Sequence, residues 1–315
     1  MDDDLDTTAV DDAALKAARQ SEREIVSRYT GEFAWVTVVL FAVLAVAYGT
    51  SVALAVSGRI PWWLAMLANT ALAYGCYTVH HEANHGNISG RRRDLKWVDD
   101  LLGRTVAVPI TLSFRGFAPL HLLHHAHTND EERDPDFYVA GSAKALPVKW
   151  LMQVVVVAIV RALPIVGPRM TASIIPRTDA TTTEGRAIMK MRRFDQLALV
   201  ALVTAFVLGF GWDALLLWWM PGKLSGLVLM TTFQWLPHHP HTETDRYRNT
   251  RVNVFMLSTP TLLEQDHHLM HHLFPRVPWY RYRRLFTEMR PLLQKHNARI
   301  EGRRLGPDVP KIALR

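Results

Sequence analysis

The chain has 315 residues, of which 49% are hydrophobic and 21% charged, and its formal net charge at pH 7 is +7. The hydrophobic residues are concentrated in long uncharged runs, which indicates a membrane protein rather than a large soluble core. The basic excess does not indicate a nucleic-acid-binding protein, because no zinc finger, aromatic-basic RNA motif or internal repeat accompanies it.

The first half of the chain contains two predicted membrane spans. Residues 1–32 begin with the acidic stretch MDDDLDTT, which is unlike a secretory signal peptide. Residues 33–56 form a run of 24 residues without a charge, which as a helix of roughly 36 Å is long enough to cross a bilayer. Residues 62–79 form a second uncharged run of 18 residues. The lone Cys76 lies in that run, so no intrachain disulfide is possible.

The second half contains a longer apolar region. Residues 197–236 include only two charged side chains, Asp213 and Lys223. A run of 40 residues is best explained as two spans. The turn between them is expected either near Gly211–Asp213 or near Pro221–Lys223. The sequence therefore predicts about four transmembrane helices.

The positions of the basic residues predict the topology. Of 36 Lys and Arg residues, 16 lie between His80 and Arg193 and 14 lie after Leu236, whereas the short turns between paired spans carry almost none. Under the positive-inside rule the long loop and both termini are cytoplasmic. We expect an all-α, multi-pass protein with a cytoplasmic helical cap, divided into an N-terminal segment (1–32), a membrane and catalytic domain (33–293) and a basic tail (294–315).

Fourteen of the 15 histidines fall in four windows, residues 80–85, 121–127, 238–241 and 267–272. Each window begins at the end of a predicted span or lies in the polar segment that follows, so all four meet on one side of the membrane. Within the windows the spacing is helical, one HxxxH and two HxxHH, so the imidazoles of each window share one helix face. Neutral imidazole is the commonest protein metal ligand, and the boxes exceed the needs of one ion. The pattern therefore predicts two metal ions.

Other functions use some of the same residues. His81-Glu82-x-x-His85 also fits the HExxH motif of zinc metalloproteases, with Glu82 as general base, but this leaves both HxxHH boxes without a role. Glu82-x-x-His85 and Glu264-x-x-His267 fit the ExxH motif of carboxylate-bridged di-iron bundles, which requires further inward glutamates. A histidine-rich membrane protein that binds metal without catalysis is the non-enzyme alternative.

The arrangement of one HxxxH and two HxxHH boxes among four spans resembles the membrane fatty-acid desaturase and hydroxylase superfamily, over roughly residues 62–286. Finer details resemble its β-carotene hydroxylase and ketolase branch. These details are HLLHHAHTNDEERDPDFY (121–138), FQWLPHHPH (233–241), YRNTRV (247–252) and HHLMHHLFPRVPWYRY (267–282).

The resemblance implies an oxidoreductase with two iron ions and O2 as co-substrate. The implied ligands are His81, His85, His121, His124, His125, His238, His268, His271 and His272. Gln234, Asp134 and Asp136 are candidate supporting residues, and the remaining windowed histidines are expected to be spectators or supporting residues. Because no haem domain or flavin motif is fused to the chain, electrons are expected from a separate protein such as a ferredoxin. The implied reaction attacks C–H bonds of a long apolar lipid, either hydroxylating a carotenoid ring or desaturating an acyl lipid.

Overall fold

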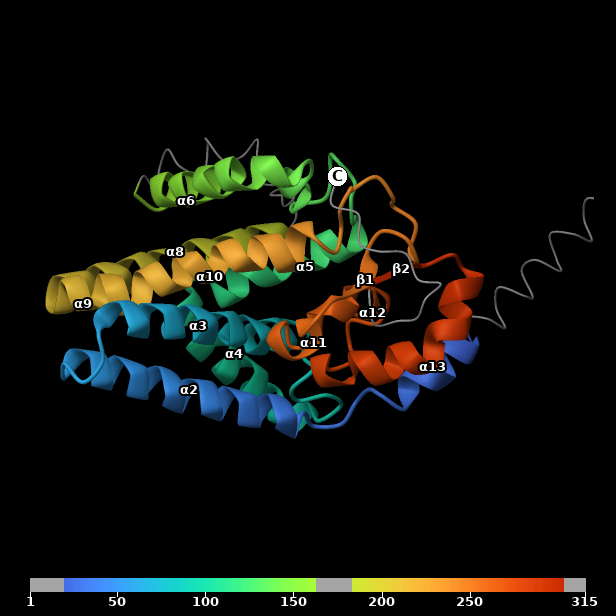
Figure 1. Cartoon of the computed structure of the whole chain (residues 1–315), viewed down its shortest axis with the longest axis horizontal. Coiled ribbons are helices and arrows are strands. Elements are labelled where there is room, and N and C mark those ends of the chain that lie inside the picture. The colour runs from blue at the N-terminus through green and yellow to red at the C-terminus, as the bar shows by residue number, and fades with distance from the viewer. Residues whose placement is uncertain (1–19, 163–182, 303–315) are drawn as a thin grey trace, which may run out of the picture.

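The computed structural model describes residues 20–162 and 183–302, which are mostly helical (Figure 1). The longer helices are α2 (Trp35–Val56), α3 (Trp62–His85), α4 (Lys96–Ile110), α5 (Phe114–Ala126), α6 (Leu146–Ala162), α8 (Thr183–Phe210), α10 (Met220–Leu229) and α13 (Tyr282–Lys295). The shorter elements are α9 (Trp212–Ala214), α11 (Ser258–Thr261), α12 (His268–Leu273), β1 (Arg251–Val254) and β2 (Arg299–Gly302). Two π-helical segments are η4 (Leu215–Trp219) and η5 (Met230–Trp235). The 3-10 turns are η1 (Arg93–Leu95), η2 (Phe137–Val139), η3 (Ala143–Ala145), η6 (Gln265–His267) and η7 (Trp279–Arg281).

Helices α2 and α3 pack side by side (Figure 1). In α2 only Thr37, Leu44 and Ser51 are buried. These residues are seven apart, so they form one stripe along the helix. Gly75 of α3 lies opposite this stripe, since a Cβ atom there would be 2.8 Å from the Leu44 side chain. The glycine lets the two helices approach closely, while the rest of α2 presents an apolar surface suited to lipid.

The third apolar run contains its turn at Gly211. This residue has φ +56°, and an uninterrupted helix, comprising α9, η4, α10 and η5, runs from Trp212 to Trp235. The rings of Phe206 and Trp218 are 5.0 Å apart, so α8 and this helix pack against each other. Of the two turn positions that the sequence allows, the structure has the first, and Pro221 lies within the second helix.

Two of the described helices are long and apolar enough to cross a membrane, namely α2 and the helix from Trp212 to Trp235. A third span results if residues 93–110 and 114–126, which are bent by 96° relative to each other, form one broken span. The second predicted run does form a helix, α3, but polar residues lower its hydropathy. One of them, Asn69, is buried and donates to the carbonyl of Leu217 at 2.8 Å.

The bend between α4 and α5 has a local cause. Thr111 ends α4 in the left-handed conformation, with φ 52°, and the Ser113 hydroxyl caps α5 by accepting from the backbone N–H of Gly116 at 2.9 Å. Gly103 of α4 gives the Phe114 ring room, because a Cβ atom there would be 2.3 Å from it. Both helices pack against α3, so the bend carries the second histidine box to the end of α3.

Residues 237–302 form a cap beyond one end of the long helices (Figure 1). The core of the cap lies between α12 and α13. The helix α12 contributes Leu269 and Met270 and the helix α13 contributes Leu285 and Met289, all fully buried. Residues 20–29 pack on the same core through apolar side chains. The cap holds the histidines of the last two windows.

One small sheet corrects the all-helical prediction. In the cap, β1 pairs in parallel with β2, and Val252 lies opposite Ile300. Strands of four residues are too short for a clear alternation, and these two are more than 40 residues apart in the chain. Their pairing therefore depends on the folded cap rather than on a local pattern.

Candidate metal centre

Four segments bring nine histidines together where the cap meets the long helices. They lie at the C-terminal end of α3, along α5, just after η5 and on α12. Within each helix the histidines are three or four residues apart, or adjacent, so their side chains project to one side. We call the nine residues the histidine cluster: His81, His85, His121, His124, His125, His238, His268, His271 and His272.

The histidine cluster divides into two adjacent groups. In each group one ligand nitrogen per residue lies within 4.8 Å of all the others, and the groups are His81, His85, His121, His125 and His271, and His124, His238 and His272. His268 does not meet this criterion for either group, and we assign it to the second because its Nε2 lies 3.1 Å from Nε2 of His272. The groups touch where the rings of His125 and His272 have centroids 4.3 Å apart. The structure thus brings together all nine residues that the sequence singled out, as five and four.

The nitrogen spacing suits a shared cation. The Nε2 atom of His121 lies 2.9 Å from that of His85 and 3.1 Å from that of His125. The Nε2 atoms of His81 and His271 are 3.0 Å apart. Two nitrogens bonded to one metal ion at about 2.1 Å and at a right angle are about 3.0 Å apart. These three pairs in the group of five therefore have the spacing of neighbouring ligands on one metal ion.

His238 provides a second indication of metal binding. Both of its ring nitrogens are buried and have no hydrogen-bond partner among the described residues. A buried nitrogen without a partner costs about 1–3 kcal/mol. Its ring centroid is 4.8 Å from that of His124 and 4.9 Å from that of His272. A metal ion held by the group of four would accept the lone pair of one His238 ring nitrogen.

The α12 histidines are neutral and so able to donate a lone pair. Burial, followed by the neighbouring imidazoles, lowers the pKa of His271 and His272 well below the ordinary value. Neutral imidazole suits iron, zinc, copper and nickel, so the donor set by itself selects no single metal.

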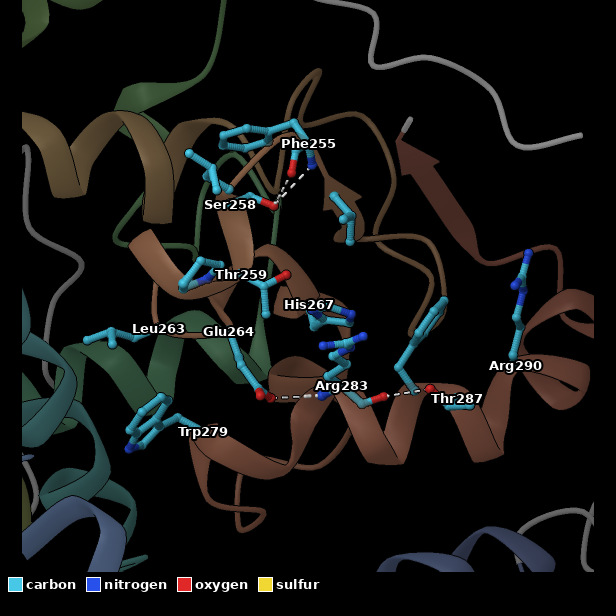
Figure 2. A pocket seen from close by; sticks show the side chains of 14 residues that line it. Phe255, Ser258, Thr259, Leu263, Glu264, His267, Trp279, Arg283, Thr287 and Arg290 are labelled. Atoms are coloured by element: carbon cyan, nitrogen blue, oxygen red, sulfur yellow. Dashed lines mark hydrogen bonds between the residues drawn. The ribbon is translucent and has the colours of Figure 1, made fainter. Parts of the chain in front are cut away.

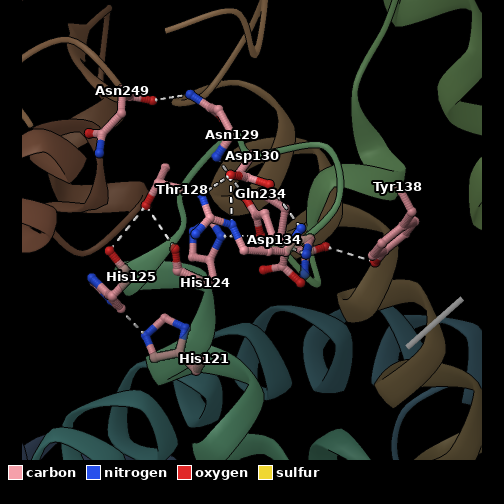
Figure 3. A network of polar contacts seen from close by, with 12 residues as sticks. His121, His124, His125, Thr128, Asn129, Asp130, Asp134, Tyr138, Gln234 and Asn249 are labelled. Atoms are coloured by element: carbon pink, nitrogen blue, oxygen red, sulfur yellow. Dashed lines mark hydrogen bonds and ion pairs between the residues drawn. The ribbon is translucent and has the colours of Figure 1, made fainter. Parts of the chain in front are cut away.

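Asp134 orients His124 (Figure 3). A carboxylate oxygen lies 2.8 Å from Nδ1 of the imidazole, and the carboxylate also accepts from the backbone N–H groups of Asn129 at 2.7 Å and Asp136 at 2.8 Å. This contact holds the proton on Nδ1 and leaves the Nε2 lone pair for a metal ion. Asp134 therefore lies where a supporting carboxylate is expected.

Gln234 and Asp136 are hydrogen-bonded to each other, and the carboxylate of Asp136 acts electrostatically on His124. Gln234 accepts a hydrogen bond from the Tyr138 hydroxyl at 3.2 Å (Figure 3), and no hydrogen bond joins it to His238 in the described chain. Gln234 points to the turn that contains Asp136, and its role as a supporting residue of the metal centre stays a prediction.

Two supporting contacts were not predicted. The Tyr282 hydroxyl lies 3.1 Å from Nδ1 of His271, and the Thr128 hydroxyl lies 3.2 Å from Nδ1 of His272. Thr128 and His272 are 144 residues apart in the chain, so no local spacing could have indicated the pair.

Glu82 is not placed as the general base of an HExxH site. Its fully buried carboxylate accepts from Nδ2 of Asn87 and from the backbone N–H of Trp279, both at 3.2 Å. Asn87 also donates to the carbonyl of Pro275 at 3.0 Å. Glu82 thus connects the end of α3 to the segment that follows α12, which is a structural role.

The remaining glutamate and histidines of the motifs also have other partners. Glu264 accepts from the backbone N–H of Arg283 at 2.9 Å and is absent from both groups of metal-ligand atoms. Nδ1 of His80 contacts Asn84 at 3.1 Å, and Nδ1 of His267 lies 2.8 Å from Asp266. His127, His239 and His241 are likewise outside both groups.

Known proteins match most of the chain. The model of the fatty acid desaturase family matches residues 57–304. A β-carotene ketolase of Paracoccus sp. is 26% identical over 221 residues, covering 68% of this chain and 75% of the relative. An sn-1 acyl-lipid omega-3 desaturase (ferredoxin) of Synechocystis sp. is 22% identical over 248 residues, covering 73% of this chain and 67% of the relative. An sn-1 oleoyl-lipid 12-desaturase of Anabaena variabilis is 33% identical over 78 residues, covering 24% and 21%.

The family match extends from the turn after α2 to the end of β2, so it includes all four histidine windows. The structure adds two adjacent groups of histidines, each of which could hold a metal ion, beside apolar helices. The chain is therefore an oxidoreductase that belongs to the fatty acid desaturase family, within the membrane di-iron superfamily.

Proposed function

We propose that the histidine cluster binds two iron ions, one in each group. The convergence of Nε2 atoms at 2.9–3.1 Å supports this proposal most directly. Iron, when bound, would supply with O2 and two electrons the oxidant that removes hydrogen from an unactivated C–H bond.

The chain's own residues prepare the site for that chemistry. Asp134 and Tyr282 hold His124 and His271 in fixed orientations, and the side chain of His271 is completely buried. The site therefore needs little rearrangement and is shielded from bulk water. Hydroxylation would consume O2, two electrons and two protons and yield an alcohol and water. Desaturation would consume the same reactants and yield an alkene and two waters.

The proposed reaction is hydroxylation of a carotenoid ring. Relatives named β-carotene ketolase match over more than two thirds of this chain, and the motif details at residues 121–138 and 233–241 support the same substrate class. Desaturation of an acyl lipid is the second candidate, supported by the acyl-lipid desaturases among the relatives. The iron site is common to both.

A host that makes β-carotene, supplied with a ferredoxin and its reductase, tests the reaction. Purified active protein should contain about two iron ions per chain, and pigment extracts should gain one oxygen per modified ring by mass spectrometry. His271→Ala removes a proposed ligand and should leave the pigment unchanged with less iron. The control is His296→Ala, because His296 stacks on Tyr247 away from the cluster and should preserve both iron and product.

Other outcomes identify the alternatives. Unchanged pigment together with acyl chains that lose two hydrogens would replace hydroxylation by desaturation on the same iron site. A single zinc ion and no iron, in protein from an iron-replete host, would contradict the iron proposal and favour the metalloprotease.

The proposal includes a membrane arrangement and an electron source. We infer four spans, with the turn of the second pair at Gly211, and a cap and both termini on the cytoplasmic side. Residues 1–32 would form the N-terminal segment, 33–293 the membrane and catalytic domain and 294–315 the basic tail. A separate acidic protein such as a ferredoxin would deliver electrons, and the name of the Synechocystis relative, which includes ferredoxin, supports this inference.

A further inference from the structure

A cavity of about 710 Å³ lies beside the histidine cluster and has no part in the proposed reaction (Figure 2). It lies between α11 and one face of α13. Apolar side chains form half of its lining, and among them are Phe255, Leu263 and Phe286. The helix α13 contributes Arg283, Thr287 and Arg290, which are three or four residues apart and so project from one face.

The charged side chains in and behind the wall of this cavity differ in their hydrogen-bond partners. Asp266, behind the cavity wall, accepts from Ser258 at 2.6 Å, Thr259 at 2.7 Å and His267 at 2.8 Å, so its charge is compensated. Glu264 is engaged by the backbone N–H of Arg283.

The Arg283 side chain differs from the carboxylates of Asp266 and Glu264. It rises from α13 into the cavity (Figure 2), and its guanidinium has no ion pair or hydrogen bond with the described residues. The positive charge of Arg283 acts on the nearby Glu264, but the N–H donors of its guanidinium stay available to a ligand. The cavity therefore favours an anion, and a guanidinium with free donors binds phosphate oxygens in a bidentate manner.

The cavity also lies beside the cap-facing ends of α2 and α3, which the proposed topology puts at the membrane surface. Its residue Trp279 donates from Nε1 to Thr37 at 3.2 Å, in the first turns of the span α2. The carbonyl of Leu262, next to the lining residue Leu263, is 3.5 Å from the Tyr74 hydroxyl, about three turns before the end of α3.

Two large apolar side chains lie at the rim of the cavity. Met256 and Leu257 are 71% and 56% exposed. Solvent would not favour this pair of side chains, whereas lipid would. A cationic cavity beside an exposed apolar loop is the combination expected of a site for a lipid headgroup.

We propose that this cavity binds the phosphate group of a membrane phospholipid, with Arg283 as the main contact and the acyl chains lying over Met256 and Leu257. The site is separate from the iron centre and independent of the proposed reaction. Its occupant anchors the cap on the bilayer.

Full-length protein in detergent can be titrated with fluorescent phosphatidylglycerol and challenged with three competitors. Unlabelled dioleoylphosphatidylglycerol should displace the probe, whereas dioleoylglycerol, which lacks the phosphate, and inorganic phosphate should not. Arg283→Gln should weaken binding about tenfold or more, and Arg283→Lys should weaken it less because it retains the charge. The matched control is Arg284→Gln, since Arg284 is exposed on α13 but does not line the cavity.

Iron content and elution volume, measured for every variant, show whether the fold is intact. Equal displacement by dioleoylglycerol would overturn the proposal, because apolar contact alone would then explain binding. Displacement by inorganic phosphate at the same concentration would also overturn it, in favour of a soluble phosphorylated ligand. Equal weakening in the Arg283→Gln and Arg284→Gln variants would show only a general effect of charge and would contradict a built site.

Discussion

Asp134 selects the nitrogen of His124 that faces the metal site. The carboxylate is itself held by two backbone N–H groups, so it cannot turn away from the imidazole. An imidazole with its Nδ1 proton fixed presents a directed lone pair at Nε2 without a further loss of conformational freedom. Loss of such a supporting contact typically lowers metal affinity about 10–100-fold.

Asp134→Asn should lower iron affinity about 10–100-fold, because a neutral amide stabilises the required tautomer less well. Iron retained after dialysis against a graded chelator measures the effect. The matched control is Asp130→Asn in the same turn, since Asp130 pairs with Arg133 and contacts no residue of the histidine cluster. Equal iron loss in both variants would assign the effect to the turn rather than to the imidazole contact.

At the scale of elements, the end of α3 is tied to the segment after α12. Glu82, Asn87 and Trp279 form a hydrogen-bonded connection between the first and third histidine boxes. The connection keeps His81 and His271 together, although 190 residues separate them in the chain. Glu82, which the metalloprotease alternative requires as the general base, is part of this connection.

Glu82→Gln should preserve most of the activity, because the amide oxygen can still accept from one of the two donors. Glu82→Ala should lower stability by about 1–3 kcal/mol, because it leaves the buried backbone N–H of Trp279 without its acceptor, whereas Asn87 still donates to the carbonyl of Pro275. Thermal unfolding and product formation, measured on both variants, distinguish the roles. An inactive Glu82→Gln variant with full iron content and normal stability would instead indicate proton transfer by Glu82.

At the scale of the whole molecule, apolar helices and a polar cap divide the chain into two regions. The helix α2 buries only a narrow stripe, whereas α3 and α4 share a hydrophobic core and the cap has its own around Leu269 and Met289. The histidine cluster lies between these regions, where the proposed substrate from the bilayer would meet electrons from the proposed soluble donor.

A reporter fused after Arg315 should be cytoplasmic, and a reporter inserted at Gly58, in the turn between α2 and α3, should be external. The physical reason is the basic charge on the long loop and tail against a single Arg59 in that turn. Protease accessibility in sealed vesicles provides the measurement. A tail accessible only from outside would reverse the proposed topology, and with it the side from which electrons arrive.

The residues of the histidine cluster show which parts of the site can be predicted from local spacing in the sequence. Spacings of three and four residues place His121, His124 and His125 on one helix face whatever the rest of the chain does, so these groupings were predictable. The contact between Thr128 and His272 could not be predicted in this way, because 144 residues separate the two in the chain.

The sequence by itself determined the features that repeat over short distances: the apolar run that becomes α2, the histidines that share helix faces, and the basic excess in the loop and tail. Only the tertiary structure decided the 96° bend before Phe114, the division of the nine imidazoles into five and four, and the pairing of β1 with β2. The reason is physical. Periodicity acts along one helix, whereas bends, shared metal sites and strand pairs depend on packing between residues that are distant in the chain.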